Sequence, residues 1–318
     1  MLLNKLFGAR GGATEAALIE DQRREPFSEF LPWVAYDPET GRYLNIDNTT
    51  GYLWECLPLT FCGQKEARTL EAIMRIHLQK GSVMQFMLYA DPNIEPFIAQ
   101  YISSKTRKSE LTERSVNAFC EFLRQGVKGI STMQNIPLRN FRLFFSIKTP
   151  DELRYDNLSI IEEALKGANL CPQRMAVGNL LDWMRRLFND HVPLHSYAYD
   201  ATKPIRKQII FAETAIHADR NQLRLGSKYA RCATPKVIPR QVDLLNTNTL
   251  SGGIMGMVDD SKQINLPFLW TVNVIYDDLK AEIHRKASLT MAQKSTGSFA
   301  IQIQKRVEEF NWALDKIE

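Results

Sequence analysis

The residues best suited to nucleotide chemistry do not complete a nucleotide-binding site. A P-loop needs G-x-x-x-x-G-K-[ST], because its glycine-rich backbone wraps the phosphates while the lysine contacts them and the hydroxyl holds Mg²⁺. Residues 294–296 (KST) supply the lysine and hydroxyls without either glycine, and the glycine-rich residues 252–256 fit no phosphate-binding pattern. We therefore predict that this chain is not an enzyme that hydrolyses nucleotide, and we expect no cofactor.

Metal and acid–base chemistry also lack a suitable arrangement. His191 and His195 have the spacing of two zinc ligands on a helix, but Pro193 lies between them and the glutamate of H-E-x-x-H is missing. The adjacent acids at 259–260 and 277–278 would point to opposite faces of a strand. The sequence predicts no catalytic residue and no metal ligand, although an enzyme site assembled from residues distant in sequence stays open as an alternative.

The cysteines are typical of a reducing compartment. Their number is odd, their spacing is scattered and no C-x-x-C occurs, so neither a zinc site nor a redox motif is indicated. We expect free and mostly buried thiols at Cys56, Cys62, Cys120, Cys171 and Cys232.

The composition is that of a folded globular protein with a nearly balanced charge. Apolar residues make up 44% and charged residues 24%, and the net charge is +4 from 40 basic and 36 acidic residues. No apolar run approaches the ~18 residues that a membrane span requires. We expect a cytoplasmic protein whose association with a membrane, if present, is peripheral.

Three basic stretches raise the question of nucleic acid. They comprise residues 105–108, residues 203–207, and the basic side chains between Arg220 and Arg231. Aromatic residues do not interleave with them in the pattern that single-strand binders use for stacking bases. The sequence favours solvated surface charge, and a nucleic-acid-binding module stays the alternative.

The N-terminal 25 residues look like a flexible tail that begins with a short apolar segment. Residues 8–12 are mostly glycine, and a charged run follows at 20–25. The first seven residues are too short for a stable interfacial helix on their own. A disordered terminus is one interpretation, and a partner-docking role is the other, carried by Leu2, Leu3, Leu6 and Phe7.

The pattern over residues 26–150 predicts a first α+β lobe. Strands at 33–36 and 42–46 flank a turn whose Asp37, Pro38 and Gly41 suit a hairpin. Apolar spacing and alternation then predict the following elements: helix 64–80, strand 82–90, helix 112–125 and strand 141–147.

The remainder predicts a second α+β lobe at 151–280 and a helical connector at 281–318. The second lobe is expected to hold two helices, the first capped by Asp156, with strands at 208–215, 222–232 and 268–276 around a loop at 233–266. The predicted fold class is α+β, with short mixed or antiparallel sheets covered by helices and ending in long C-terminal helices. The last helix has no Gly or Pro stop signal, so we expect more protein after it.

The order of several segments resembles a known family. Residues 31–33, the strand at 43–46, Gly51, the helix at 64–80 and the strand at 83–86 are similar to the N-terminal region of TraC-like proteins. These are the conjugation ATPases of F-type systems, within the type IV secretion motors. The resemblance extends over residues 28–318 through these further segments: 229–231, 266–275 and 308–314.

The resemblance implies a division of labour. In the family, a motor with Walker A and Walker B motifs follows, so we expect this chain to be an N-terminal part. That part would dock the motor to inner-membrane components of a secretion channel, with its own C-terminal ATPase domain and a homo-oligomer of the full-length protein as further partners. It would serve pilus assembly and conjugative DNA transfer from the cytoplasmic side of the inner membrane; a nucleic-acid-binding module of the same apparatus is the alternative.

Overall fold

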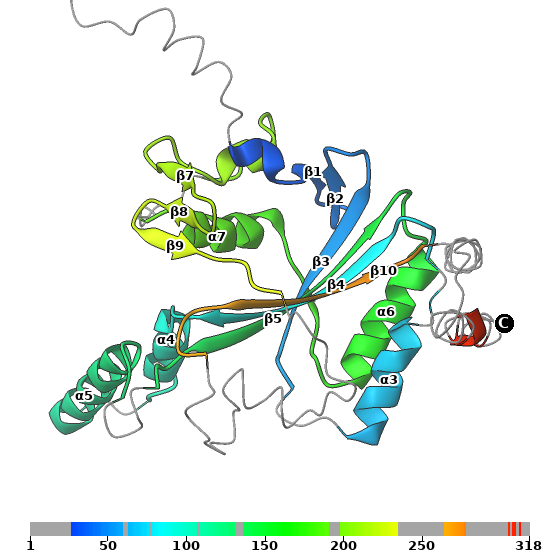
Figure 1. The fold of residues 1–318 in the computed structure, drawn as a ribbon. Coiled ribbons are helices and arrows are strands. Elements are labelled where there is room, and N and C mark those ends of the chain that lie inside the picture. Colours follow the sequence, from blue (N-terminus) through cyan, green and yellow to red (C-terminus); the bar gives the residue numbers. More distant parts are fainter. Residues whose placement is uncertain are drawn as a thin grey trace, which may run out of the picture. The chain divides into compact units, whose positions relative to one another are not determined.

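The structure is a computed structural model, shown as a ribbon in Figure 1. It describes the following residues: 27–59, 63–74, 76, 78–106, 109–130, 136–190, 198–234, 264–277, 305, 307–309 and 312.

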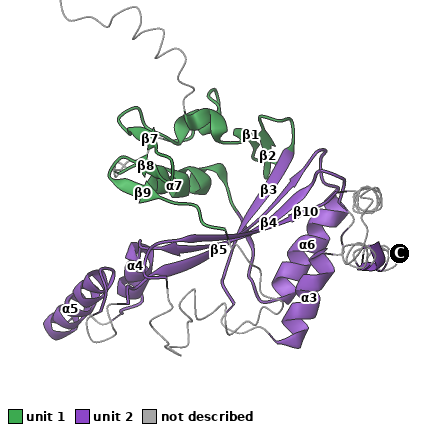
Figure 2. Cartoon of the chain, in the orientation of Figure 1, with its two compact units in different colours: residues 1–49, 175–241 green, residues 50–174, 242–318 purple. Residues whose placement is uncertain are grey.

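The chain divides into two compact units, and each unit combines two separate stretches of sequence (Figure 2). Unit 1 comprises residues 1–49 and 175–241, and unit 2 comprises residues 50–174 and 242–318.

Unit 1 is built from short elements around one longer helix. A β-hairpin and a small three-stranded antiparallel sheet, in the order β7-β8-β9, accompany this helix. The elements are η1 (Phe27–Phe30), β1 (Trp33–Asp37), β2 (Arg42–Asn45), α7 (Val177–Phe188), η3 (Ile205–Gln208), β7 (Ile216–Ala218), β8 (Leu223–Leu225) and β9 (Lys228–Ala230).

The hairpin β1–β2 forms where the turn chemistry predicts it. The Asp37 carboxylate accepts hydrogen bonds from the backbone N–H of Glu39 (3.0 Å) and the hydroxyl of Thr40 (2.7 Å). Gly41 closes the turn with φ +70°, a left-handed conformation that glycine adopts without strain. The buried Tyr43 then donates its hydroxyl hydrogen to the carbonyl of Met175 (2.7 Å), which links β2 to the start of α7.

Asn189, at the end of α7, explains why the predicted strand at 208–215 is wrong. Its amide nitrogen donates to the carbonyl of Ile209, and its oxygen accepts from the N–H of Phe211 and the hydroxyl of Thr214. These bonds occupy backbone groups that a strand would offer to a ladder. Gln208 is therefore the last residue of the 3₁₀-helix η3, and residues 209–215 have no strand structure.

A pair of glycines in unit 1 gives a test of the fold. Gly226 has φ +61°, and a Cβ there would lie 2.1 Å from Oδ2 of Asp190, whose carboxylate accepts hydrogen bonds from Ser227. We expect Gly226→Ala to lower the free energy of unfolding by about 2–3 kcal/mol, because left-handed strain adds to the loss of these bonds. Gly178→Ala is the control in urea denaturation: its Cβ meets nothing within 4 Å, so stability should stay or rise by up to about 0.5 kcal/mol. Equal losses in the two variants would contradict the expected strain at Gly226.

Unit 2 is a twisted antiparallel sheet in the order β3-β5-β4-β10, with β6 paired to the end of β3. Its elements are β3 (Thr50–Cys56), α3 (Gln64–Met74), β4 (Val83–Asp91), α4 (Glu95–Ser103), α5 (Glu110–Gly126), β5 (Asn140–Thr149), α6 (Tyr155–Gly167), β6 (Gln173–Arg174) and β10 (Leu269–Ile275).

The core of unit 2 lies between one face of the sheet and the helices α3 and α6 (Figure 1). Trp54, Phe145 and Phe86 are directly paired across β3, β5 and β4 and point to this face. Their rings pack in sequence, with centroids 5.6 Å apart for Trp54–Phe145 and 4.7 Å for Phe86–Phe145. Ile161 and Leu165 of α6 complete a fully buried layer. This packing holds in place the sheet from which the helices α4 and α5 extend.

Several sequence-based boundaries need correction. β3 and α4 were not predicted, and the predicted strand at 222–232 is two short strands joined by a turn. Asp156 is not the cap of α6: Arg154 occupies that position without a side-chain bond, and Asp156 lies in the first turn. The predicted helix 64–80 is described as α3 only up to Met74.

The α+β fold class is confirmed, with antiparallel sheets and covering helices. The long C-terminal helices stay a prediction. Beyond residue 277 the structure describes only residues 305, 307–309 and 312, which are helical. The glycine-rich residues 252–256 and residues 294–296 lie outside the described part of the chain.

Candidate functional site

A pair of helices, α4 and α5, connects β4 to β5 and lies at the end of these strands away from α3 and α6 (Figure 1). We call it the helical arm. It has a small core of its own, in which Ile94, Ile98 and Cys120 are buried. Around these pack Tyr101, Val116, Leu123 and Val127. The arm is thus a locally stabilised hairpin of helices carried by the sheet.

The outer side of α5 exposes large apolar residues. Leu111, Ala118 and Phe122 are spaced by seven and four residues, so they share a stripe that the arm's core does not use. Leu111 is 79% exposed and Phe122 is 52% exposed. Phe97 and Ile102 add exposed apolar surface on α4. Apolar side chains gathered in this way are typical of a surface that binds another protein.

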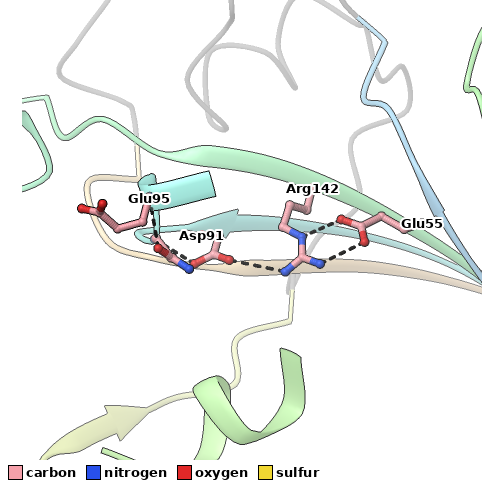
Figure 3. Close-up of polar contacts among 5 residues, drawn as sticks. Glu55, Asp91, Glu95 and Arg142 are labelled. Carbon is pink, nitrogen blue, oxygen red and sulfur yellow. Dashed lines mark hydrogen bonds and ion pairs between the residues drawn. The ribbon is translucent and has the colours of Figure 1, made fainter. Parts of the chain in front are cut away.

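The base of the arm is held by ionic contacts across three strands (Figure 3). Arg142 of β5 donates two hydrogen bonds to the Glu55 carboxylate of β3, at 2.6 and 3.0 Å. Its Nη1 lies 3.5 Å from Oδ2 of Asp91, the last residue of β4. Bidentate geometry of this kind is the strongest form of an arginine–carboxylate pair.

The contacts continue from Asp91 into the arm (Figure 3). Oδ1 of Asp91 accepts from the N–H of Asn93 (2.9 Å), and Oδ1 of Asn93 accepts from the N–H of Glu95 (3.2 Å) at the start of α4. The Glu95 carboxylate in turn accepts two bonds from Arg124 of α5, at 2.8 and 3.0 Å. We call this series, from Glu55 to Arg124, the polar relay. It connects the end of β4 to the start of α4 and joins α4 to α5.

Burial makes the Arg142 end of the relay the stronger one. The side chain of Arg142 is 15% exposed and that of Asp91 is 9% exposed. Burial alone lowers the pKa of Arg142, but the hydrogen bonds and charge of Glu55, with a smaller part from Asp91, outweigh it and raise the pKa overall. Arg142 therefore stays charged at every pH at which the protein is folded. Its single positive charge offsets one of the two negative charges on Glu55 and Asp91.

The exposed end of the relay gives a pH prediction. The hydrogen bonds from Arg124 lower the pKa of Glu95 below its ordinary 4.5. The stabilisation from this pair is therefore present above pH 4.5 and is lost as the pH falls through the lowered pKa. In an NMR titration of the Glu95 carboxyl we expect a midpoint below 4.5 that returns toward 4.5 in Arg124→Gln. An unchanged midpoint in the variant would show that the pair does not form.

Similarity to known proteins shows the family to which this chain belongs. The family model described as "TraC protein" matches residues 27–318. The chain belongs to the TraC family. It is 23% identical over 302 residues to "Protein TraC" of Escherichia coli (strain K12). The alignment covers 86% of this chain and 34% of that protein. The chain thus spans about a third of the length of the curated relative.

The docking residues predicted at the N-terminus of this TraC-family chain, Leu2, Leu3, Leu6 and Phe7, lie outside the described residues, as do His191 and His195. Within the ranges that the structure describes, no three His, Cys, Asp or Glu side chains are grouped as metal ligands would be. None of the helices described is long and apolar enough to cross a membrane.

The described thiols offer little chemistry. Cys56 and Cys120 are buried, whereas Cys171 and Cys232 are exposed, which departs in part from the expectation of buried thiols. Burial raises the pKa of Cys56 to about 12, so it remains a thiol at neutral pH and is a poor nucleophile.

The sequence predicted α5 of the arm, but it did not indicate α4, the polar relay or the aromatic side chain that lies among basic ones in unit 1. Cross-strand pairing aligns His217, Arg224 and Tyr229 on one face of the β7-β8-β9 sheet, where all three are exposed. Arg231 lies two residues from Tyr229 and donates to Gln222. The alternating pattern in the sequence, together with the Gly226 turn, could have indicated this row.

Proposed function

We propose that this TraC-family chain is the docking and assembly part of a type IV secretion motor that serves pilus assembly and conjugative DNA transfer. The observation that carries the proposal is the family match over residues 27–318. The partners are inner-membrane components of the secretion channel, and the chain associates peripherally with the cytoplasmic side of that membrane. Nucleotide hydrolysis belongs to a motor domain outside these 318 residues, and the full-length protein forms a homo-oligomer.

The helical arm is the surface that supports this proposal best. The polar relay joins its helices to each other and to the sheet, which restricts the directions in which the apolar stripe of α5 can point. Preorganisation of this kind lowers the entropy lost on binding. Phe122 and Leu111 supply the large apolar anchors on which protein interfaces depend.

A test in cells separates docking from catalysis. In the protein as its host makes it, we expect Phe122→Asp with Leu111→Asp to reduce conjugative transfer by at least about tenfold, since a lost apolar anchor costs more than about 1.4 kcal/mol. Nucleotide hydrolysis by the purified protein should stay unchanged. Ile160→Asp, an exposed apolar residue of α6, is the matched control and should transfer normally. Normal transfer by the arm variant would refute the arm as the docking surface.

The chain itself is expected not to bind nucleotide. The melting temperature of the purified 318-residue chain should not rise with ATP and Mg²⁺, because only a ligand that binds the folded state stabilises it. A rise that grows with ATP concentration would show a nucleotide site within these residues.

Single-stranded nucleic acid is the second candidate, favoured by the exposed row His217–Arg224–Tyr229. A tyrosine beside arginines on a sheet can stack a base while the guanidinium groups contact phosphates. Binding of a single-stranded oligonucleotide should then fall steeply between two salt concentrations. Tyr229→Ala should weaken it by roughly tenfold, as expected for one stacked base. Binding that is absent at low salt would exclude this candidate.

A further inference from the structure

The edge of the unit 2 sheet formed by β10 is unusually open. All seven residues of β10 pair with β4 without a bulge. Its side chains are nevertheless largely exposed, including Val272 (50%) and Ile275 (64%). No strand in the described part of the chain pairs with its outer edge. Natural proteins protect such edges with charges, prolines or bulges, and residues 269–275 have none of these.

The backbone of β10 shows which groups the open edge offers. Tyr276 exchanges both of its backbone bonds with the β4 side, through Ser82 O and Gly81 N, and the carbonyl of Phe268 accepts from Ala90. Backbone groups alternate sides along a strand, so the even-numbered residues face β4. The residues whose N–H and C=O groups face outward are therefore Leu269, Thr271, Asn273 and Ile275.

The sequence of β10 is a palindrome of residue types about Val272. Reading outward, Val272 is followed on either side by a polar residue (Thr271, Asn273) and then by two apolar residues (Trp270 with Leu269, Val274 with Ile275). An antiparallel copy of the strand centred on Val272 would thus place polar opposite polar and apolar opposite apolar. Cross-strand pairs of matched type stabilise a sheet, and the strand carries no charge that would repel its copy.

We propose that β10 pairs with β10 of a second copy of this chain, antiparallel about a two-fold axis at Val272. In this register the outward-facing Thr271 lies opposite Asn273 of the copy, and Leu269 lies opposite Ile275. Each of these pairs exchanges two backbone hydrogen bonds, so every outward-facing group of β10 gains a partner. The two sheets become one continuous sheet across the axis.

The side chains favour the same arrangement. Trp270, Val272 and Val274 point to the face that carries α3 and α6, because Val272 pairs with Phe86 of that face. A two-fold axis perpendicular to the sheet keeps the corresponding residues of the copy on the same face. The three side chains from each copy then form one apolar seam, which withdraws from water the surface that is exposed in the single chain. An isologous contact of this kind closes as a dimer.

A disulfide cross-link tests the register directly. Val272 faces β4 with its backbone, so Val272 and its copy form a non-hydrogen-bonded pair with Cα atoms about 4.5 Å apart, within the range of a disulfide. In a background with Cys62, Cys171 and Cys232 changed to Ser, Val272→Cys should give a linked dimer under mild oxidation. Thr271→Cys is the matched control: Thr271 and its copy are diagonal neighbours about 7–8 Å apart, so this variant should form no disulfide-linked dimer under the same oxidation.

Sedimentation of the unlinked protein provides the second measurement. The chain should show a concentration-dependent dimer. Thr271→Pro should abolish it without unfolding the chain, because that N–H points outward and is not used by the β4 ladder. The arm variant Phe122→Asp should dimerise normally, which separates this inference from the docking proposal. A chain that stays monomeric, or a Val272→Cys variant that links no better than Thr271→Cys, would overturn the inference.

Discussion

Arg142→Met is expected to lower the free energy of unfolding of unit 2 by about 2–4 kcal/mol. Removing one member of a buried ion pair leaves uncompensated charge and typically costs about 3–5 kcal/mol. The partial exposure of Glu55 reduces that figure. The substitution leaves the Glu55 and Asp91 carboxylates facing each other without their shared cation. Native-state hydrogen exchange of the β5 amides measures the loss.

Two further variants make this prediction specific. Arg124→Met removes the exposed pair with Glu95 by the same substitution, and its cost should be much smaller, because solvent screens surface pairs. Adding Glu55→Met to Arg142→Met should recover part of the loss, because one unpaired charge is then absent. Equal losses for Arg142→Met and Arg124→Met would show that the buried end of the polar relay contributes no more to the free energy of unfolding than the exposed end.

Trp54→Ala is expected to have the largest effect on stability, a loss of about 3–5 kcal/mol. Trp54 is fully buried between β3 and α6, and its ring packs against Phe145. Its Nε1 also donates to Oε1 of Glu162 in α6 at 3.0 Å. The variant therefore leaves a cavity and removes a hydrogen bond between sheet and helix.

A graded series separates the two contributions. Trp54→Phe keeps an aromatic ring in the core and loses the N–H donor, so it should cost about 1–2 kcal/mol. Urea denaturation followed by far-ultraviolet circular dichroism measures both variants. A loss below about 1 kcal/mol for Trp54→Ala would contradict the central place given to this residue in the core.

Elements fixed by local chemistry were predicted from the sequence. The β1–β2 hairpin follows from Asp37 and Gly41, which act within the turn itself. α5 and α7 follow from apolar spacing along one segment. The α+β fold class follows from the sum of such elements.

Elements that depend on distant partners were not predicted. β3 has buried residues on both faces and so lacks the alternation of an ordinary antiparallel strand. α4 contains Pro96, which suggests a loop, yet a proline is tolerated in the first turn of a helix. The apolar run near Ile209 suggested a strand, but the Asn189 side chain takes its backbone groups from 20 residues away.

The candidate site was beyond sequence reasoning for the same reason. Glu55 and Arg142 are separated by 87 positions and meet only because β3 and β5 are neighbours in the sheet. The compact units likewise join stretches that are far apart in sequence, which a survey along the chain does not show. The exposed stripe of the arm can be recognised only once it is known which side of α5 packs against α4.

Binding to membrane vesicles tests the docking claim most directly. Inverted inner-membrane vesicles are prepared from cells with and without the membrane components of the chain's own transfer system, and flotation measures the bound fraction of the purified chain. We predict binding to the first vesicles alone, its loss in the variant with Leu111→Asp and Phe122→Asp, and its retention in Ile160→Asp. Equal binding to both kinds of vesicle, or no binding to either, would contradict the claim that this chain docks the motor to the channel.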